Sequence, residues 1–270
     1  MFIYNFFTLI TIIATANAVE LNRQFLFNNG YGERSDKIIL KNQNFSNIES
    51  NIFNGFVNII EVNLNQNQIG SMDPRTFDKL NILEIIDLSS NKLALIDSRL
   101  FYGLINLSQI NLKNNLISQL DSRTFDGLIN LINLNLASNF IESIDIRTFE
   151  GLKNLKFIDL SSNRIAQVEP FLFKNLIQLN SIDLGNNRLS GFDPKTFSDM
   201  PQLEQLGLYK NSIVQIEPYS FNGSFKLVNL YLAGNKMNSL EPKCLNGMKK
   251  LKSIDLSYNR IRYLEDEVFS

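Results

Sequence analysis

The sequence contains no histidine and a single cysteine, and these two shortages exclude several classes of enzyme and metal site. Without histidine there can be no Ser–His–Asp triad, no Cys–His dyad and no histidine-ligated metal. One cysteine cannot build a disulfide framework or a cysteine zinc site. The formal net charge of −1 excludes a strongly basic nucleic-acid binder, so we expect no nucleic-acid partner. Catalysis by carboxylates, lysine or tyrosine survives these exclusions.

The first eighteen residues have the composition of a secretory signal peptide. They contain no charged side chain, an apolar stretch from Phe6 to Ala14, and the small-residue pattern Ala16-Asn17-Ala18 before an expected cleavage at Val19. An uncleaved membrane anchor is the alternative, but the apolar stretch is short beside the ~20 residues that a spanning helix needs. We therefore predict a secreted, extracellular protein whose mature chain has no membrane span.

The rest of the chain repeats one pattern of 24 residues. The pattern reads L-x-x-L-x-L-x-x-N-x-L-x-x-I-x-x-x-x-F-x-x-L-x-x, and positions within it are numbered 1 to 24 below. Ten repeats begin at residues 35, 59, 83, 107, 131, 155, 179, 203, 227 and 251, and the last is incomplete. The predicted organisation is a signal peptide over 1–18, an N-terminal capping segment over 19–34, and repeats over 35–270.

This motif resembles the leucine-rich repeat family in its 24-residue extracellular type, and the chain looks like the ectodomains of Toll-family and related secreted or surface proteins. The resemblance covers residues 35–270. It implies an α/β-type leucine-rich-repeat solenoid, a curved right-handed superhelix. Its parallel sheet would lie on the concave face, with short helical turns or loops on the convex face.

The physical basis of the pattern does not depend on the family. Alternation at positions 4, 5 and 6 predicts a short strand with one buried face, and strands one repeat apart would stack into a parallel sheet. The apolar positions 1, 4, 6, 11, 14, 19 and 22 would fill a continuous interior. One repeat alone cannot bury them, so the repeats are expected to be stable only as a stack.

Position 9 is asparagine in nine repeats, and we interpret this column as structural rather than catalytic. An amide side chain both donates and accepts hydrogen bonds, so it can satisfy the backbone where the chain turns away from the sheet. The predicted structural ladder consists of Asn67, Asn91, Asn115, Asn139, Asn163, Asn187, Asn211, Asn235 and Asn259.

Position 15 is acidic in all ten repeats, and five of the six prolines follow it directly. An acidic side chain followed by proline is typical of an N-cap and the first position of a helical turn. We favour capping over the alternative, a row of calcium ligands, because the periodicity needs only the cap. No metal and no cofactor are expected.

Ligand binding in a stacked-repeat protein normally uses the exposed concave sheet, here positions 3, 5, 7, 8 and 10. Tyrosines on the last three repeats lie beside small residues there, and tyrosine is enriched among interface hot spots. The alternative is that tyrosine is simply a good strand residue on an exposed face. The candidate ligand-binding residues are Tyr209, Lys210, Tyr231, Tyr258, Arg260 and Phe157.

These features predict a non-enzymatic recognition or scaffold protein that binds an extracellular protein, peptide or glycan on its concave face. The resemblance implies innate immunity or cell adhesion as the setting. One alternative is a truncated ectodomain of a longer membrane receptor or matrix protein. Another is an enzyme that uses a carboxylate pair such as Asp159 and Asp183, on an open surface rather than in a pocket.

Three further features complete the expectations. Cys244 is interpreted as a small buried thiol, with a bridge to a second chain as the alternative. The last repeat has apolar residues that nothing in the given sequence covers, with the acidic residues 265–267 as a partial cap. We therefore predict either an end-to-end homodimer through this repeat or a natural form in which the chain continues. The secretory route makes three sequons glycosylation candidates: Asn44, Asn106 and Asn222.

Overall fold

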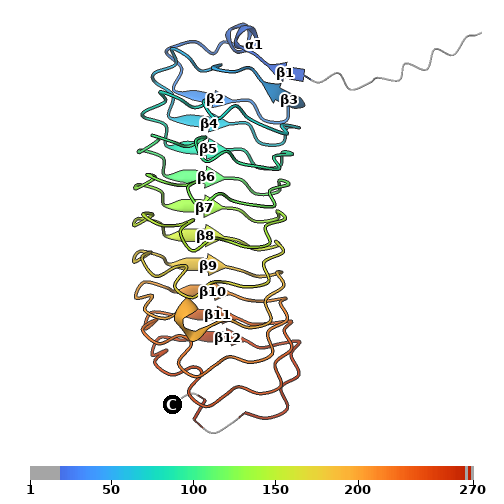
Figure 1. Cartoon of the computed structure of the whole chain (residues 1–270), viewed down its shortest axis with the longest axis vertical. Coiled ribbons are helices and arrows are strands. Elements are labelled where there is room, and N and C mark those ends of the chain that lie inside the picture. Colours follow the sequence, from blue (N-terminus) through green and yellow to red (C-terminus); the bar gives the residue numbers. More distant parts are fainter. Residues whose placement is uncertain (1–18, 265–266, 269–270) are drawn as a thin grey trace, which may run out of the picture.

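The computed structural model describes residues 19–264 and 267–268, and they form one elongated stack of turns (Figure 1). The expected signal peptide and the expected acidic residues Glu265 and Asp266 lie outside the described residues. The elements, in chain order, are β1 (Val19–Leu21), α1 (Arg23–Asn28), β2 (Lys37–Ile39), β3 (Phe45–Ile48), β4 (Glu61–Asn63), β5 (Ile85–Asp87), β6 (Gln109–Asn111), β7 (Asn133–Asn135), β8 (Phe157–Asp159), β9 (Ser181–Asp183), the 3-10 helix η1 (Pro194–Thr196), β10 (Gln205–Gly207), β11 (Asn229–Tyr231) and β12 (Ser253–Asp255).

One strand from each repeat joins a ten-stranded parallel sheet in the order β12-β11-β10-β9-β8-β7-β6-β5-β4-β2. We call each of these strands, with the loop that follows it, a rung, and we number the rungs 1 to 10 as the repeats to which they belong. The strands occupy positions 3–5, one residue earlier than the alternation predicted. Position 6 still takes part in pairing: the Leu64 N–H, for example, donates to the Asp87 carbonyl of the next rung at 2.8 Å. The expected parallel-sheet solenoid is therefore confirmed, with its strands shifted by one residue.

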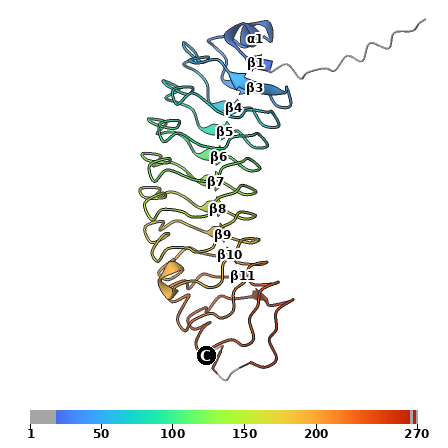
Figure 2. The ribbon, with the colours of Figure 1, turned by 45° about the vertical axis from the view of Figure 1, so that its right-hand side comes forward.

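The interior is a continuous apolar core with a column of phenylalanines at position 19. The described members of this column are at most 2% exposed. From Phe101 to Phe221, consecutive rings stack with centroids 6.0–6.4 Å apart. Adjacent strands of a sheet lie only about 4.8 Å apart, so the phenylalanine side of each repeat is thicker than the sheet side. The stack accordingly curves with the sheet inside the arc and η1 on its outer side (Figure 2).

The N-terminal segment closes the first repeat with elements that the repeat pattern does not contain. β1 pairs in parallel with β3 in a separate two-stranded sheet. Helix α1 begins after Asn22, whose side chain accepts from the Phe25 N–H. Leu26 is fully buried and Phe25 packs edge-on against Phe45. Phe27 on the same helix is 45% exposed, with its ring centre 6.1 Å from that of Phe56.

The convex side consists almost entirely of turns. Among the described repeats, η1 is the one short helix there, so loops dominate over helical turns. Irregular turns suffice because each repeat must only carry the chain from one parallel strand to the next.

Candidate ligand-binding face

The asparagine column is tied completely into the backbone. The Asn163 amide donates to the carbonyls of Leu136, Leu160 and Ser161 at 3.0–3.3 Å, and its oxygen accepts from the Ile141 N–H at 3.1 Å. Each of the nine asparagines joins its own rung to the preceding one in this manner. Their amide hydrogens and amide oxygens are thus engaged within the scaffold, which supports a structural role.

A second column of polar side chains lies on the concave surface, at position 5. In seven rungs an Asp or Asn there accepts from the N–H of position 7 in the same rung, at 2.8–3.2 Å. We call these the Asx rungs. Their position-5 side chains are Asn63, Asp87, Asn111, Asn135, Asp159, Asp183 and Asp255. Asp159 and Asp183, the carboxylate pair considered for catalysis, therefore each accept a hydrogen bond from a backbone N–H of their own rung.

Rungs 8 and 9 break this column, because position 5 is Gly207 in one and Tyr231 in the other. Here the concave surface contains a hollow of about 670 Å³, which we call the tyrosine notch. Four of the six sequence-predicted candidates line it together. Its residues are Asp183, Tyr209, Lys210, Tyr231, Ala233, Gly234, Asp255, Ser257 and Tyr258. The other two candidates, Arg260 and Phe157, are exposed but do not line the notch.

Tyr209 forms the wall of the notch by leaning back over the preceding rung. A Cβ on Gly185 would lie 2.2 Å from its ring, so only glycine admits the ring there. The Tyr209 hydroxyl donates to the Asp183 carboxylate at 3.2 Å. Burial and the neighbouring carboxylate raise the pKa of Tyr209 to about 12, and burial also raises the pKa of Asp183. Tyr209 is thus held in place before any ligand arrives.

Sequence reasoning missed Gly185 and Asp183 as parts of this site. The contact crosses from position 7 of one rung to positions 5 and 7 of the preceding one, which no pattern within a single repeat reveals. The available signal was the replacement of polar side chains by Gly185 and Gly207 on the rungs where the tyrosines begin.

Position 8 has a positive φ in every repeat, between 50° and 70°. Small or amide side chains fill it in most rungs, and glycine fills it at Gly234. Lys210 and Tyr258 are the bulky exceptions, and a bulky residue in this region is strained. Both line the notch, and Tyr258 is 89% exposed. Backbone strain therefore coincides with the candidate site.

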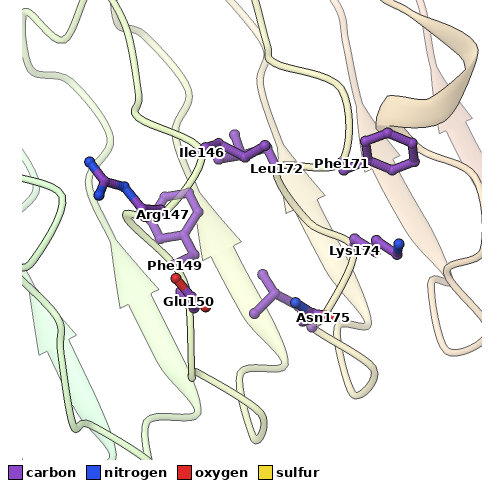
Figure 3. A pocket seen from close by; sticks show the side chains of 9 residues that line it. Ile146, Arg147, Phe149, Glu150, Phe171, Leu172, Lys174 and Asn175 are labelled. Carbon is purple, nitrogen blue, oxygen red and sulfur yellow. The ribbon is translucent and has the colours of Figure 1, made fainter.

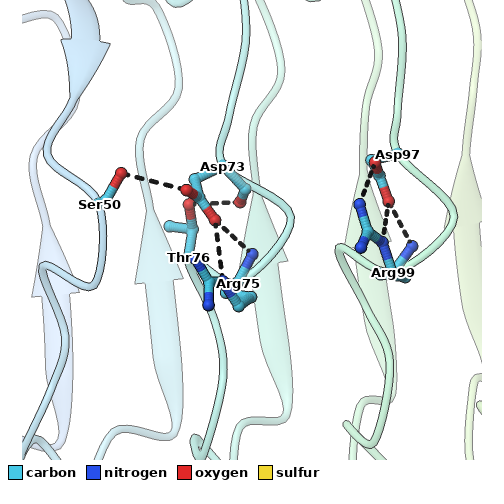
Figure 4. A network of polar contacts seen from close by, with 6 residues as sticks. All are labelled: Ser50, Asp73, Arg75, Thr76, Asp97 and Arg99. Carbon is cyan, nitrogen blue, oxygen red and sulfur yellow. Dashed lines mark hydrogen bonds and ion pairs between the residues drawn. The ribbon is translucent and has the colours of Figure 1, made fainter.

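Among the described acids of position 15, which lie on the convex side, the aspartates alone act as turn caps. Asp73 and Asp97 accept from the N–H two residues ahead at 2.8 and 2.9 Å (Figure 4). These bonds, and that of Arg99 with Asp97, lower the pKa of both carboxyls. Asp121, Asp145 and Asp193 make the same backbone bond.

In the four repeats whose position-15 glutamate is described, position 17 instead adopts positive φ, and the longer side chain does not make the bond two residues ahead. The positive-φ residues are Asn51, Phe171, Tyr219 and Lys243. The expectation of one repeated cap is therefore wrong for these repeats. Among the described residues, no group of three acidic or sulfur side chains is arranged to hold a metal ion.

A smaller hollow of about 260 Å³ lies on the convex side between repeats 5 and 6 (Figure 3). Phe171 and Lys174 stand on one side of it, with Ile146 and Arg147 on the other. The Lys174 ammonium lies 5.1 Å from the Phe171 ring centre. Its polar side chains do not converge on one point, so the tyrosine notch is the stronger candidate.

The remaining candidates are placed as follows. Cys244 is fully buried, and burial raises the pKa of its thiol to about 11, which opposes an interchain bridge through the folded protein. The sequon residues Asn44, Asn106 and Asn222 are all exposed. Within the described part of the chain, no helix has the length and apolarity required to cross a bilayer.

Comparisons with known proteins agree with this architecture. No curated protein sequence matches the chain. Among solved structures, it is similar to a chain of the Drosophila Toll–Spätzle complex, with a TM-score of 0.78, 26% identity and coverage of 92% of this chain and 33% of that one. For the glycosylated form of that complex, the TM-score is 0.82 and the identity 27%, with coverage of 93% of this chain and 33% of that one. For a chain of the TLR13–ssRNA13 complex, the TM-score is 0.77 and the identity 30%, with coverage of 83% of this chain and 32% of that one.

The protein thus spans about a third of the length of the Toll and TLR13 chains that it resembles. The leucine rich repeat family model matches residues 36–93, 83–139, 105–165, 129–176, 158–213, 177–237 and 225–270. Together with the ladder of asparagines and the parallel sheet, these matches show that the chain belongs to the leucine-rich repeat family.

Proposed function

We propose that this protein is a secreted, non-enzymatic recognition module that binds an extracellular protein ligand on its concave face. The observation that carries the proposal is the tyrosine notch, where four candidate residues meet around a preformed hollow. Buried tyrosine contacts are frequent hot spots of protein interfaces. The similar solved chains come from complexes with Spätzle and with single-stranded RNA, which supports a recognition role in innate immunity.

A protein ligand fits this chain better than a nucleic acid. The net charge is −1, and Asp183 and Asp255 line the notch itself. Phosphate backbones are bound by clusters of lysine and arginine, which this arrangement does not provide. Cell adhesion is the second setting for the same binding face.

The test compares ligand binding by a variant of the notch with binding by a variant of another part of the concave face. The purified protein, a Tyr231→Ala/Tyr258→Ala variant and a Lys113→Ala control are used to capture ligands from extracellular fluid of the source organism. Lys113 is exposed on an Asx rung, away from the notch. The ligand should be retained by the parent and the control, and the tyrosine variant should lose about 2 kcal/mol or more of affinity. Equal binding by all three would place the site elsewhere, and Phe157→Ala and Arg260→Ala would then be tested.

A second candidate is that these repeats act within a longer membrane receptor or matrix protein. The coverage of only a third of the Toll chain favours it. The mass of the native protein, intact and deglycosylated, separates the two candidates. It also tests cleavage before Val19 and glycans on Asn44, Asn106 and Asn222.

We further propose that the last rung pairs with a second copy of the chain. Among the described strands, β12 has a neighbour on one side only, and Ile254, Leu256 and Ile261 are half-buried although their counterparts in inner repeats are fully buried. Such an edge favours association. Light scattering should show a dimer whose dissociation depends on concentration. A monomer at high concentration, with the last repeat protected in hydrogen exchange, would contradict this.

A further inference from the structure

The tyrosine notch differs from the Asx rungs in a feature that side chains alone do not show. On each Asx rung the position-7 N–H is paired with the position-5 side chain. On rungs 8 and 9 position 5 supplies no oxygen, and the N–H groups of Tyr209 and Ala233 have no hydrogen-bond partner. Among the described rungs, only Lys41, which follows Ile39 in rung 1, shares this condition.

The two unpaired donors point toward the concave surface. Position-5 side chains on the other rungs reach the equivalent N–H groups from that surface, so those of Tyr209 and Ala233 face the same way. They belong to adjacent rungs, which lie about 4.8 Å apart. Unpaired backbone donors are rare in folded proteins unless water or a ligand satisfies them.

The two donors differ in what lies in front of them. Gly207 has no side chain of its own beside the Tyr209 N–H, but the place that its Cβ would take lies 2.7 Å from an Asp183 carboxylate oxygen and 3.4 Å from the Tyr209 ring. A ligand oxygen that reaches this donor must therefore turn the Asp183 side chain aside. Tyr231 and Tyr258 provide apolar ring surface beside the donors. A ligand at this place can therefore combine acceptor oxygens with an apolar side chain.

The charges around the donors favour a neutral acceptor. Asp183 lies on the rung before the two donors and Asp255 on the rung after them, and the Ser257 bonds keep the pKa of Asp255 low. Two carboxylates at this range repel an anionic group. Lys210 opposes them, but its side chain is exposed to solvent.

We propose that the notch binds an extended segment of a protein partner through a neutral amide oxygen, held between the N–H groups of Tyr209 and Ala233. This oxygen replaces the Asp or Asn oxygen that the Asx rungs supply internally. An apolar side chain next to that amide packs on Tyr231 and Tyr258. The proposal rests on the proposed function, and it specifies the chemistry of the ligand at that site.

The experiment follows backbone amides by two-dimensional proton–nitrogen NMR of the full mature chain. The probe is N-acetyl-phenylalanine methylamide, a neutral molecule with two amide carbonyls and one aromatic ring. Its addition should move the Tyr209 and Ala233 amide protons downfield together and saturably. The paired amides of Ala137 and Ser161, which lie outside the notch, should stay in place. The isolated donor of Lys41 should respond at least tenfold more weakly, because it lacks the rings.

Two matched variants test the oxygen separately from the ring. Tyr231→Asn and Tyr231→Leu both remove the ring, but only Asn restores an internal acceptor for the Ala233 N–H. The probe-induced shift of Ala233 should vanish in Tyr231→Asn and persist, weakened, in Tyr231→Leu. Gly207→Asn repeats the test at Tyr209, where the added Cβ requires the Asp183 side chain to turn aside. Dispersed amide spectra verify the fold of each variant.

Four results would overturn the proposal. Shifts of tyrosine ring signals alone would show stacking without an amide contact and leave the proposed function intact. Tighter binding of N-acetyl-phenylalanine, the carboxylate analogue, would contradict a neutral acceptor. Shifts of the two amides by methyl mannoside but not by the peptide probe would assign the site to glycans. If no probe shifts any amide of the notch, the inference is contradicted. The proposed function is still tested separately by ligand capture with the tyrosine variants.

Discussion

The Asx rungs and the two rungs of the tyrosine notch share one backbone but use their concave surface differently. On an Asx rung, Asp159 accepts from both the N–H and the hydroxyl of Ser161, so the polar groups satisfy one another. On rungs 8 and 9, Gly207 and Tyr231 leave the equivalent donors unpaired. Donors that are paired within the protein gain little from a ligand, whereas unpaired donors can form new hydrogen bonds with a ligand acceptor.

The difference is confined to the surface layer. Beneath both regions the asparagine ladder, the strand register of 24 residues and the phenylalanine column continue unchanged through rung 8. Substitutions at the concave positions can therefore alter binding while the scaffold stays intact. This separation is typical of proteins in which a site is supported by a repeated scaffold.

The largest expected effect comes from substitutions in the asparagine ladder, which the two regions share. Asn163→Leu and Asn211→Leu each remove four hydrogen bonds and leave buried backbone groups unpaired. Each should lower the free energy of unfolding by about 3 kcal/mol, from the 1–3 kcal/mol typical of one unsatisfied group. Urea unfolding measures both. A loss at one site only would show that the ladder is not equivalent in the two regions.

A smaller effect, of opposite sign, should come from relieving strain in the notch. Tyr258→Asn places at a positive-φ position the residue type found there in Asx rungs, such as Asn114 and Asn186. We expect a gain of about 1 kcal/mol in stability, since bulky residues in this region cost roughly 1–3 kcal/mol. The reverse change, Asn114→Tyr, should lose a similar amount. Thermal unfolding tests the pair, and matching signs for the two variants would contradict the strain argument.

The smallest expected effect concerns the placement of Tyr209. Gly185→Ala displaces its ring from the preceding rung, because the added Cβ would lie 2.2 Å from the ring. The pKa of Tyr209, now about 12, should fall toward the ordinary 10.0 as the hydroxyl leaves Asp183. Gly185 is buried beneath this ring, but the ring can move out into solvent, so stability should fall by about 1 kcal/mol, at the low end of the cost of overpacking. Spectrophotometric titration of tyrosine, with Tyr209→Phe as reference, measures the shift.

The same raised pKa sets a pH dependence for the parent protein. The folded state holds the Tyr209 proton up to about pH 12, whereas the unfolded chain releases it near pH 10.0. The stabilisation is therefore present below pH 10 and is lost as the pH rises through this window. Tyr209→Phe should flatten this part of the stability curve. An identical slope in both proteins would show that Tyr209 does not titrate differently on folding.

Much of this structure follows from the repeat, because each apolar position recurs in the same environment. The ten-stranded sheet, the buried core and the meeting of Tyr209, Tyr231 and Tyr258 could be predicted by placing residues on successive rungs. The β1–β3 sheet could not, since Val19 and Phe45 pair outside the repeat register. The lean of Tyr209 over Gly185 also depends on side-chain rotation between rungs, which spacing does not encode.

The turns show a similar limit. Asp and Glu at position 15 have the same charge, and composition treats them alike. Their difference of one methylene decides whether the N–H two residues ahead is bonded, as at Arg99, or whether the backbone enters positive φ, as at Phe171. The acidic column by itself therefore predicts one cap for every repeat, and the turn geometry is needed to show that Asp and Glu behave differently.

The phenylalanine column has a consequence for the size of any partner. Rings stacked 6.0–6.4 Å apart behind a sheet whose strands lie about 4.8 Å apart bend the stack into an arc. A straight segment laid along the inside of an arc touches a few rungs and then lifts away. A partner that contacts the notch and also reaches Phe157 must therefore present a rounded surface. A single extended segment would contact the last rungs alone.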